Sequence, residues 1–448
     1  MIYINHFLSI FKKNEKKDCI IWKSKKISYG WLLEKYKYWC NYLDKKNVSG
    51  GKVVTIQADF SPNSISLLLA LIARGNIIVP LTRSVESKKD EFLRVSQTEI
   101  LIEIHNDDTV TFQLLENDSN HELYFPLKSE KKPGLVLFSS GSTGKSKAAV
   151  HDLTKLIEKF TIKKQTLITI TFLLYDHIGG FNTLLYILSN GGLVVTVQNR
   201  KPEHILKLVE KYKVELLPTS PTFLNLILIS EEYKNYDLSS LKLITYGTEP
   251  MPQITLDRFN DLLPNVKFKQ TYGLSEVGIL RSKSKNSKSL WLKIGGEGYQ
   301  TRIIDDMLEI KSKSAMLGYL NAPSPFTRDG WFKTGDKIEQ KGEFIKILGR
   351  DSEIINVGGE KVYPQEVENI ILKNQEIKDV TVFGEKNQIT GNIVCAKLTL
   401  KNNKIDKSKF EKTIKKHCSR NLQNFKVPIK IYFEKGMLHN PRQKKSRS

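Results

Sequence analysis

Residues 135–151 combine an apolar run with hydroxyls, glycines and lysines in an order that suits the binding of phosphate. The four residues Leu135–Phe138 predict a buried strand. The residues that follow offer unhindered backbone N–H groups, hydroxyl donors and two glycines, which adopt positive φ angles without strain. Two lysines add positive charge beside these donors. The segment therefore predicts a polyphosphate site made of Ser139, Ser140, Gly141, Ser142, Thr143, Gly144 and Lys147.

A Walker loop does not explain this segment, because that loop needs a glycine five positions before the glycine of its Gly-Lys-Ser ending. Ser139 stands at that position. The segment instead resembles the phosphate loop of adenylate-forming enzymes, the family of acyl-CoA synthetases, peptide-synthetase adenylation domains and luciferases. Their usual form is Thr-Ser-Gly-Thr-Thr-Gly-x-Pro-Lys-Gly, and this chain has Ser146 for the proline and Ala148 for the last glycine. A Ser- and Gly-rich loop alone is equally typical of a flexible turn, so the interpretation depends on the rest of the chain.

Three further segments resemble motifs of the same family and follow in the family's order. Thr271–Glu276 is similar to the Tyr-Gly-x-Thr-Glu motif, with a serine that keeps the hydroxyl of the threonine. Gly330–Asp336 is similar to Gly-Trp-x-x-Thr-Gly-Asp, and Gly349–Val362 to the hinge and the glycine loop beyond it. The resemblance extends from about Ile27 to Arg447 and so covers nearly the whole chain.

The order of strand-like and helix-like segments in the sequence predicts an α/β fold in two parts. Between residues 50 and 345, short β-branched runs alternate with helical stretches, as in a layered α/β domain. After Gly349, a helix opened by Pro364, two strand-like runs and a charged helix predict a compact α+β module. We expect a large layered α/β N-terminal adenylation domain at residues 1–348 and a small α+β C-terminal lid domain at residues 349–448. The polar patch Arg281–Ser289 is expected to be an exposed loop.

The resemblance implies that the matched residues bind ATP and Mg²⁺. Mg²⁺ is a hard cation that prefers carboxylate and phosphate oxygens. A structural interpretation is also open for the main residues: Tyr272 as core, Glu276 as a surface acid and Asp336 as a turn residue. The implied roles place the adenine beside Gly247, Thr248, Glu249, Thr271, Tyr272 and Gly273, the α-phosphate at Ser275, Mg²⁺ at Glu276, and the ribose at Asp336 and Arg350.

The C-terminal tail resembles the family's Gly-Lys-x-x-Arg ending, whose lysine bridges the acid and the α-phosphate. Alignment with residues 440–447 puts Lys444 at this catalytic position and Gln443 in place of the usual glycine. Because that glycine is missing, Lys445 remains an alternative.

The residues around His177 bear on the acid substrate. In peptide synthetases, an aspartate of this region pairs with the α-ammonium of an amino acid, and here that position falls on Ile178. A buried ammonium without a partner is costly, so amino-acid activation is disfavoured. His177 resembles the pocket gate of acyl- and aryl-CoA synthetases and is counted as a catalytic residue, although a single histidine also fits a hydrogen-bonded core position. The expected lining is apolar and suits a fatty, aryl or hydroxy acid: Phe223, Leu224, Val277, Gly278 and Ile279.

The predicted function is an ATP-dependent carboxylic acid:thiol ligase. Adenylation activates the carboxylate for attack by a thiol. The negative carboxylate and the negative phosphates of ATP repel each other, by roughly 4 kcal/mol for unit charges ~4 Å apart at an intermediate dielectric. Cations and oriented donors must therefore surround the α-phosphate. Gly359 belongs to a segment that resembles the lid loop lining the pantetheine tunnel, so the acceptor is either coenzyme A or the phosphopantetheine of an acyl carrier protein.

Bulk composition leaves two other function classes to weigh. The 448 residues carry a formal net charge of +22, which suits nucleic acid, but the lysines are spread along the chain without interleaved aromatic residues. A non-catalytic nucleotide or acyl sensor is favoured only by Gln443 and Ser146. No apolar run reaches the roughly 18 residues of a membrane helix, and the start does not resemble a signal peptide, so we expect a cytoplasmic protein without membrane insertion.

Overall fold

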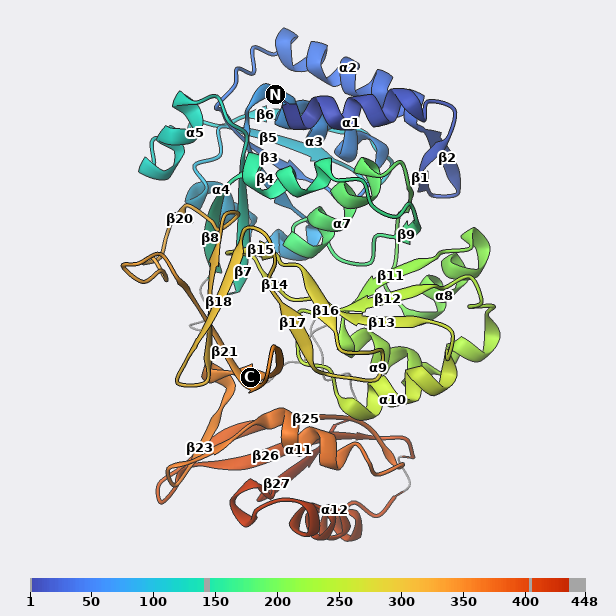
Figure 1. Ribbon diagram of the computed structural model, residues 1–448, viewed down its shortest axis with the longest axis vertical. Coiled ribbons are helices and arrows are strands. Elements are labelled where there is room, and N and C mark those ends of the chain that lie inside the picture. The colour runs from blue at the N-terminus through green and yellow to red at the C-terminus, as the bar shows by residue number, and fades with distance from the viewer. Residues whose placement is uncertain (1, 141–145, 403–404, 435–448) are drawn as a thin grey trace.

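The computed structural model describes residues 2–140, 146–402 and 405–434. Within these ranges the chain forms two seven-stranded sheets, a six-stranded sheet, a five-stranded sheet and a two-stranded hairpin (Figure 1). The helices are α1 Ile2–Lys13, α2 Tyr29–Lys45, α3 Pro62–Arg74, α4 Lys89–Val95, α5 Phe125–Ser129, α6 Leu153–Ile157, α7 Ile178–Ser189, α8 Pro202–Tyr212, α9 Pro221–Ser230, α10 Gln253–Leu262, α11 Pro364–Ile371 and α12 Lys407–Asn421.

The two seven-stranded sheets contain most of the parallel strands. The first sheet has, in spatial order, β20 Gly318–Tyr319, β8 Ser146–Asp152, β7 Gly134–Ser140, β4 Ile77–Leu81, β3 Val53–Gln57, β5 Ile100–Ile104 and β6 Val110–Leu114. The second sheet has β13 Lys267–Gln270, β12 Leu243–Tyr246, β11 Leu216–Thr219, β9 Ile168–Ile170, β10 Leu193–Val195, β1 Asp18–Trp22 and β2 Lys25–Ser28.

The remaining strands are antiparallel except for β27, which pairs parallel to β26. The third sheet has β16 Ser282–Ser284, β17 Leu292–Ile294, β22 Phe344–Arg350, β21 Phe332–Lys341, β19 Met307–Ser312 and β18 Tyr299–Ile304. The hairpin has β14 Gly273–Leu274 and β15 Gly278–Ile279. The C-terminal sheet has β24 Glu360–Val362, β23 Ile355–Val357, β26 Gly391–Leu400 and β25 Ile377–Asn387, with β27 Lys430–Phe433 beside β26.

A hydrophobic core joins the two seven-stranded sheets. This first cluster takes apolar side chains from both sheets and from α1, α2, α3 and α7. The α3 helix is apolar on nearly all sides, as expected of a helix enclosed by the core. Ser61 and Ser64 form a capping box at its N-terminus, and Gly75 ends it in the left-handed conformation at φ 74°. A second cluster fills the opposite face of the second sheet against α8, α9 and α10.

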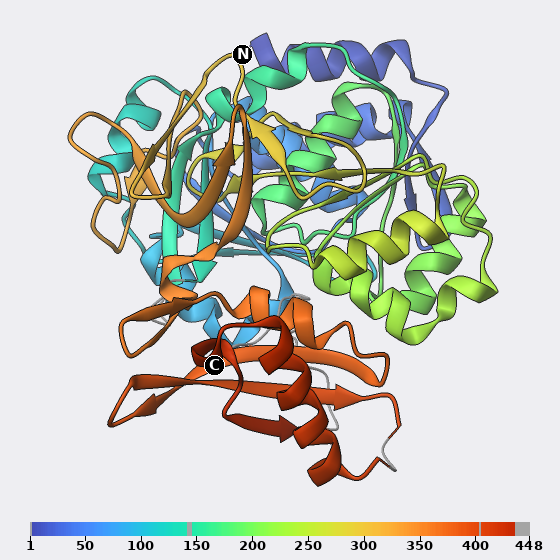
Figure 2. The same ribbon diagram turned by 60° about the horizontal axis from the view of Figure 1, so that its bottom comes forward.

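The expected α/β fold, with a large N-terminal part and a small C-terminal α+β part, is confirmed. The C-terminal strands and helices have their own apolar cluster, which includes Val367, Val380 and Ile414. Figures 1 and 2 both place this segment, orange to red, at one end of the molecule. The boundary between residues 348 and 349, which lies inside β22, stays a prediction.

One expectation about the fold is wrong in part. The polar patch Arg281–Ser289 was expected to be a loop, but Ser282–Ser284 form β16, paired with β17. The side-chain hydroxyls of Ser282 and Ser284 bond the backbone of Gln270. These long-range contacts hold a polar segment as a strand although its own residues give no strand pattern.

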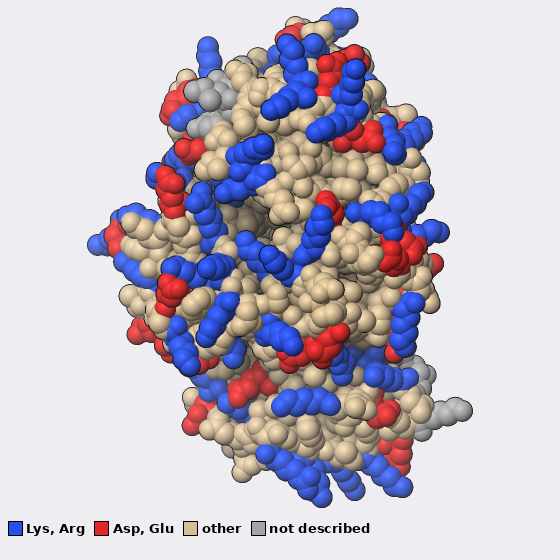
Figure 3. Space-filling view, turned by 45° about the vertical axis from the view of Figure 1, so that its right-hand side comes forward, with Lys and Arg blue, Asp and Glu red and all other residues tan. Residues whose placement is uncertain are grey.

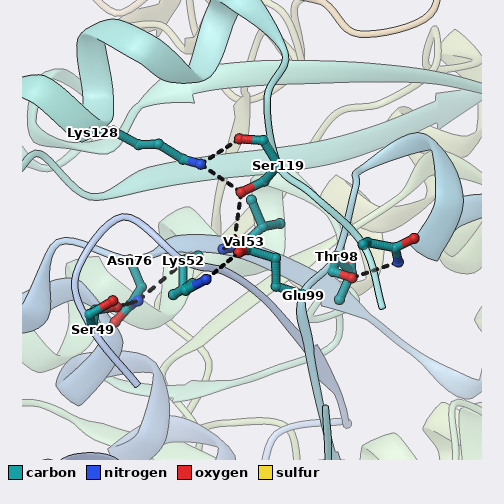
Figure 4. Close-up of polar contacts among 9 residues, drawn as sticks. Ser49, Lys52, Val53, Asn76, Thr98, Glu99, Ser119 and Lys128 are labelled. Carbon is teal, nitrogen blue, oxygen red and sulfur yellow. Dashed lines mark hydrogen bonds and ion pairs between the residues drawn. The ribbon is translucent and has the colours of Figure 1, made fainter. Parts of the chain in front are cut away.

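Glu99 anchors one end of the first sheet (Figure 4). Its carboxylate accepts hydrogen bonds from Lys52 Nζ at 2.6 Å, Ser119 Oγ at 2.6 Å and the backbone N–H of Val53 at 2.9 Å. Lys128 Nζ donates to Ser119 Oγ at 2.6 Å and so joins the same group. Burial opposes ionisation, but the three donors lower the pKa of Glu99.

We expect Glu99→Ala to destabilise the protein by about 2–3 kcal/mol, because it leaves Lys52 and Ser119 without their shared acceptor. Urea unfolding followed by circular dichroism measures this loss. Glu116→Ala removes an exposed carboxylate nearby and serves as the control. Equal midpoints for the two variants would show that the Glu99 group contributes little.

Candidate active site

Glu276 is the point at which separate segments meet. Its Oε1 accepts a hydrogen bond from Tyr319 Oη at 2.8 Å and from Ser139 Oγ at 3.3 Å. Glu276 follows β14, Ser139 belongs to β7, and Tyr319 ends the short strand β20, so the hairpin and the first sheet converge here (Figure 1). The carboxylate is only 9% exposed. The start of the phosphate segment and the acid expected to bind Mg²⁺ are therefore in direct contact.

The strand beside the phosphate loop is fixed by residues that sequence reasoning missed. Lys147 Nζ lies 5.3 Å from the ring centroid of Tyr319. Asn321 accepts from the N–H of Ala148 at 3.0 Å and donates to the carbonyl of Ser146 at 2.9 Å. Sequence reasoning had no local signal for Tyr319 and Asn321, because their partners lie 43 and 173 residues away.

The serine that replaces the usual proline has a partner of its own. Lys88 Nζ donates to Ser146 Oγ at 3.3 Å, and Ser146 is 7% exposed. Lys88 ends a 3-10 helix, Arg83–Lys88, that follows β4. An additional cation therefore stands at the edge of the phosphate segment.

Asp336 connects the third sheet to the Thr271–Glu276 segment. Asp336 and Arg350 are cross-strand partners in β21 and β22, and Arg350 Nε lies 3.3 Å from Asp336 Oδ1. Tyr272 Oη donates to Asp336 Oδ2, and burial is the main cause that raises the pKa of Tyr272. Burial also raises the pKa of Asp336, while Arg350 opposes the rise. Tyr272 packs with Val277 in an apolar cluster, so contact of its ring with adenine stays a prediction.

The loop expected on the adenine side lies directly against the same segment. A Cβ on Gly247 would come within 2.6 Å of Thr271 Oγ1, so only glycine fits this close approach. Thr248 adopts a left-handed φ of 74°, and Glu249 accepts from the N–H of Thr222 at 2.7 Å in the first turn of α9. The structure thus brings Gly247 directly against Thr271, while Glu249 contacts the start of α9.

His151 supports the backbone of Ser275. Its Nε2 donates to the Ser275 carbonyl at 2.6 Å, and the ring is fully buried. Burial lowers the pKa of His151 to about 4, so the imidazole stays neutral at physiological pH. Ser275 itself is half-buried.

His177 stands at the start of α7. Its Nδ1 accepts from the N–H of Gly179 at 3.2 Å, which makes the half-buried ring an N-terminal cap. This is the structural interpretation allowed for a single histidine, and a role as pocket gate stays a prediction. Phe223 and Leu224, expected to line the acid site, are fully buried in the second cluster.

Gly359 is an expected site residue that lies outside this group. Gly359 lies in an exposed turn between β23 and β24, where its N–H donates to Asn356 Oδ1 at 3.0 Å. The backbone of Ser140 pairs with Ser146. Gly141, Ser142, Thr143, Gly144 and Lys444 lie outside the described residues.

The donor set around Glu276 fits a hard divalent cation bound mainly by phosphate. The hydrogen bonds that described side chains donate to Glu276 both reach Oε1. Mg²⁺ usually takes one or two carboxylates together with substrate phosphates and water. No group of three or more His, Cys, Asp or Glu side chains suited to a metal occurs in the described part of the chain.

Two family models match the chain. One, described as AMP-binding enzyme, matches residues 10–306, and the other, described as AMP-binding enzyme C-terminal domain, matches residues 366–444. The chain belongs to the AMP-binding enzyme family. The resemblance to adenylate-forming enzymes is thereby confirmed.

Named relatives of this AMP-binding enzyme are acid–CoA ligases. The 4-coumarate–CoA ligase-like 9 of Arabidopsis thaliana is 27% identical over 300 residues, which are 60% of this chain and 53% of the relative. The indoleacetate–CoA ligase of Aromatoleum aromaticum is 27% identical over 311 residues, 63% of this chain and 60% of the relative. The matches thus span between half and two thirds of these relatives.

Solved structures share the fold over nearly the full length. The anthranilate CoA ligase AuaEII in complex with anthranoyl-AMP has a TM-score of 0.81 at 19% identity, covering 98% of this chain and 95% of that chain. The o-succinylbenzoate CoA synthetase of Bacillus subtilis, in complex with its acyl-adenylate, has a TM-score of 0.79 at 18% identity, covering 99% and 97%. In the part of this chain that the structure describes, none of the helices has the length and apolarity needed to cross a bilayer.

We expect Tyr319→Phe to raise the Mg²⁺ concentration for half-maximal pyrophosphate exchange by about 3- to 10-fold. The change keeps the ring under Lys147 but removes one donor from a buried carboxylate, which costs about 1–3 kcal/mol. Magnesium titration of the exchange rate measures the shift. Tyr299→Phe, which removes a hydroxyl bonded to Ser314 instead, is the control. Superimposable magnesium curves for wild type and Tyr319→Phe would contradict the positioning role.

The buried His151 predicts a loss of stability in acid. Its pKa is depressed from the ordinary 6.5 of a histidine to about 4, so between these values the unfolded chain binds a proton that the folded chain excludes. Stability therefore falls as pH falls through this window, and His151 accounts for about 1 kcal/mol between pH 7.5 and 5.5. Urea midpoints of wild type and His151→Gln at both pH values isolate the contribution. Parallel pH dependences of the two proteins would show that His151 is not the cause.

Proposed function

We propose that this protein is an ATP-dependent carboxylic acid:thiol ligase that forms an acyl-adenylate and then a thioester. The observation that carries the proposal is the contact group around Glu276 and Asp336. Three segments that resemble family motifs supply it, and its contacts join Ser139 to Glu276, 137 residues apart, and Tyr272 to Asp336, 64 residues apart. Polar side chains from segments so distant in sequence lie side by side, which favours a shared chemical role.

In the adenylation step, a carboxylate oxygen attacks the α-phosphorus of ATP and pyrophosphate leaves. The phosphate segment from Ser139 to Lys147 would hold the β- and γ-phosphates, and Lys88 adds charge at its edge. Ser275 would donate to the α-phosphate, with its backbone held by His151. Mg²⁺ held by Glu276 would neutralise charge on the leaving pyrophosphate. Asp336, kept in place by Arg350 and Tyr272, would bind the ribose hydroxyls.

The acid is proposed to be a fatty, aryl or hydroxy acid rather than an amino acid. Ile178 is 3% exposed at the position where an amino acid would need an acidic partner for its ammonium. Val277, Gly278 and Ile279 follow Glu276 directly and are apolar; Val277 and Gly278 are buried and Ile279 is partly exposed. The ammonium of an amino acid would lose its hydration there without gaining a partner.

Coenzyme A is the proposed acceptor, because the relatives reported above are named as CoA ligases. A carrier protein presents the same pantetheine arm as coenzyme A. The exposed Gly359 turn would contact this arm only after the C-terminal lid rotates. The basic surface suits either partner. On the face shown in Figure 3, lysines and arginines are scattered among acids and do not gather in one stripe, which speaks against nucleic acid as the ligand.

We expect Lys444→Ala to lower acid-dependent ATP–pyrophosphate exchange at least 100-fold while leaving the affinity for ATP within about 3-fold. The lysine would neutralise charge between carboxylate and α-phosphate mainly in the transition state. Exchange assays over an acid panel, with acyl-AMP identified by mass, measure the loss.

Lys445→Ala is the matched control for the tail alignment. Full exchange in Lys444→Ala together with loss in Lys445→Ala would reassign the catalytic lysine. Absence of exchange in the wild type with every acid would instead support the non-catalytic sensor and overturn the ligase.

A further inference from the structure

Lys159 is a covered lysine without an acidic partner. It lies in the 3-10 helix Glu158–Thr161 that follows α6, and its Nζ donates to the Ile279 carbonyl at 3.1 Å. Burial is the main cause that lowers the pKa of Lys159 to about 8, and nearby Arg281 lowers it further. Within the described residues, no carboxylate offsets either effect.

Other partly buried lysines of this protein differ from Lys159 in having an acidic partner. Lys89, Lys337 and Lys426 have side chains less than a fifth exposed, at 18%, 14% and 15%, and each reaches a carboxylate. The ammonium of Lys159 meets the Ile279 carbonyl and, 5.3 Å from its centroid, the Phe160 ring, so among the described residues it contacts neutral groups only and loses hydration without full compensation. An ammonium also has three donors, and the Ile279 carbonyl engages one of them. Lys159 is therefore suited to an anion that the protein itself does not supply.

The position of Lys159 points toward the proposed acid site. Ile279 lies opposite Gly273 in the hairpin that carries Ser275 and Glu276. The register and the strand repeat put the Cα of Ile279 within about 12 Å of the Cα of Ser275. The α7 helix, which begins after His177, packs against both the 3-10 helix of Lys159 and β15.

A second lysine lies on the second sheet. Lys269 is half-buried in β13, and burial lowers its pKa with no acid nearby. Its neighbour Phe268 points into the second cluster, so Lys269 points to the other face of the sheet. On that face Leu243 packs against the first cluster, which also holds Phe160 beside Lys159. The two lysines thus belong to one side of the second sheet.

We propose that the acid activated by this protein carries a second carboxylate, and that Lys159, assisted by Lys269, binds it. This inference rests on the proposed ligase function and narrows its substrate to a compact dicarboxylic acid. One carboxylate is adenylated near Ser275. The other pairs with Lys159 and Lys269, for which the described residues supply no acidic partner. The apolar residues Val277–Ile279 then flank the spacer between the two groups.

The test compares acids that differ only at the distal end: succinate with butyrate, glutarate with pentanoate, and phthalate with 2-methylbenzoate. Pyrophosphate exchange gives kcat/KM for each acid with wild type, Lys159→Met and Lys269→Met. We expect the wild type to prefer a diacid over its partner. Lys159→Met should lower kcat/KM for that diacid by about 10- to 100-fold, which corresponds to one charge-assisted hydrogen bond, and change the monoacid by less than about 3-fold.

Lys155→Met and Lys267→Met remove exposed lysines from α6 and β13 and serve as matched controls. Thermal unfolding distinguishes a loss of acid binding from a loss of folding stability. Removal of a cation without an acidic partner should leave the melting temperature unchanged or raise it. The inference is overturned if wild type has the same kcat/KM for the diacid and the monoacid of every pair, or if Lys159→Met lowers both values equally. The proposed ligase function would stand in either case. Absence of exchange with any of the six acids and with the wider acid panel overturns the ligase, and the inference falls with it.

Discussion

The carboxylate of Glu276 is buried at the junction of three segments, and its need for donors determines how they are arranged. A buried carboxylate is stable only when hydrogen bonds replace its lost hydration. Tyr319 and Ser139 supply two of these donors, both to Oε1. Tyr319 also lies under Lys147, and Asn321 fixes the backbone of the strand that carries Lys147. One acid thus fixes the phosphate segment, the hairpin and the strand β20 relative to one another.

A second acid extends this arrangement to the third sheet. Asp336 is paired with Arg350 across two strands and accepts from Tyr272, four residues before Glu276. The two buried acids are therefore connected through a short, rigid hairpin. Arg350 ends β22, so the ion pair lies at the start of the C-terminal part.

The sequence predicted elements and motif positions well where the signal is local. The run Leu135–Phe138 falls inside β7, and the helix opened by Pro364 is α11. The group around Glu276 and Asp336 contains residues named from motif resemblance. Tyr319, Asn321 and Lys88 were missed, because their importance comes from contacts with residues 43 to 173 positions away. The strand β16 was missed for the same reason: its serines bond Gln270 and carry no hydrophobic pattern.

The two departures from the usual phosphate loop, Ser146 and Ala148, lie in strand β8 and not among the residues whose hydroxyl and backbone N–H groups would donate to phosphate. Ser146 pairs with Ser140 as the last register pair of the β7–β8 ladder, and a proline there would have no N–H to offer. Its hydroxyl accepts from Lys88, which a proline also could not do. Ala148 is fully buried, and its N–H is bonded by Asn321. Ser146 therefore adds contacts that a proline could not make, Ala148 keeps the backbone bond that a glycine would make, and the hydroxyls and glycines of the loop are retained in the sequence, which argues for a retained phosphate site and against a chain that has lost its chemistry.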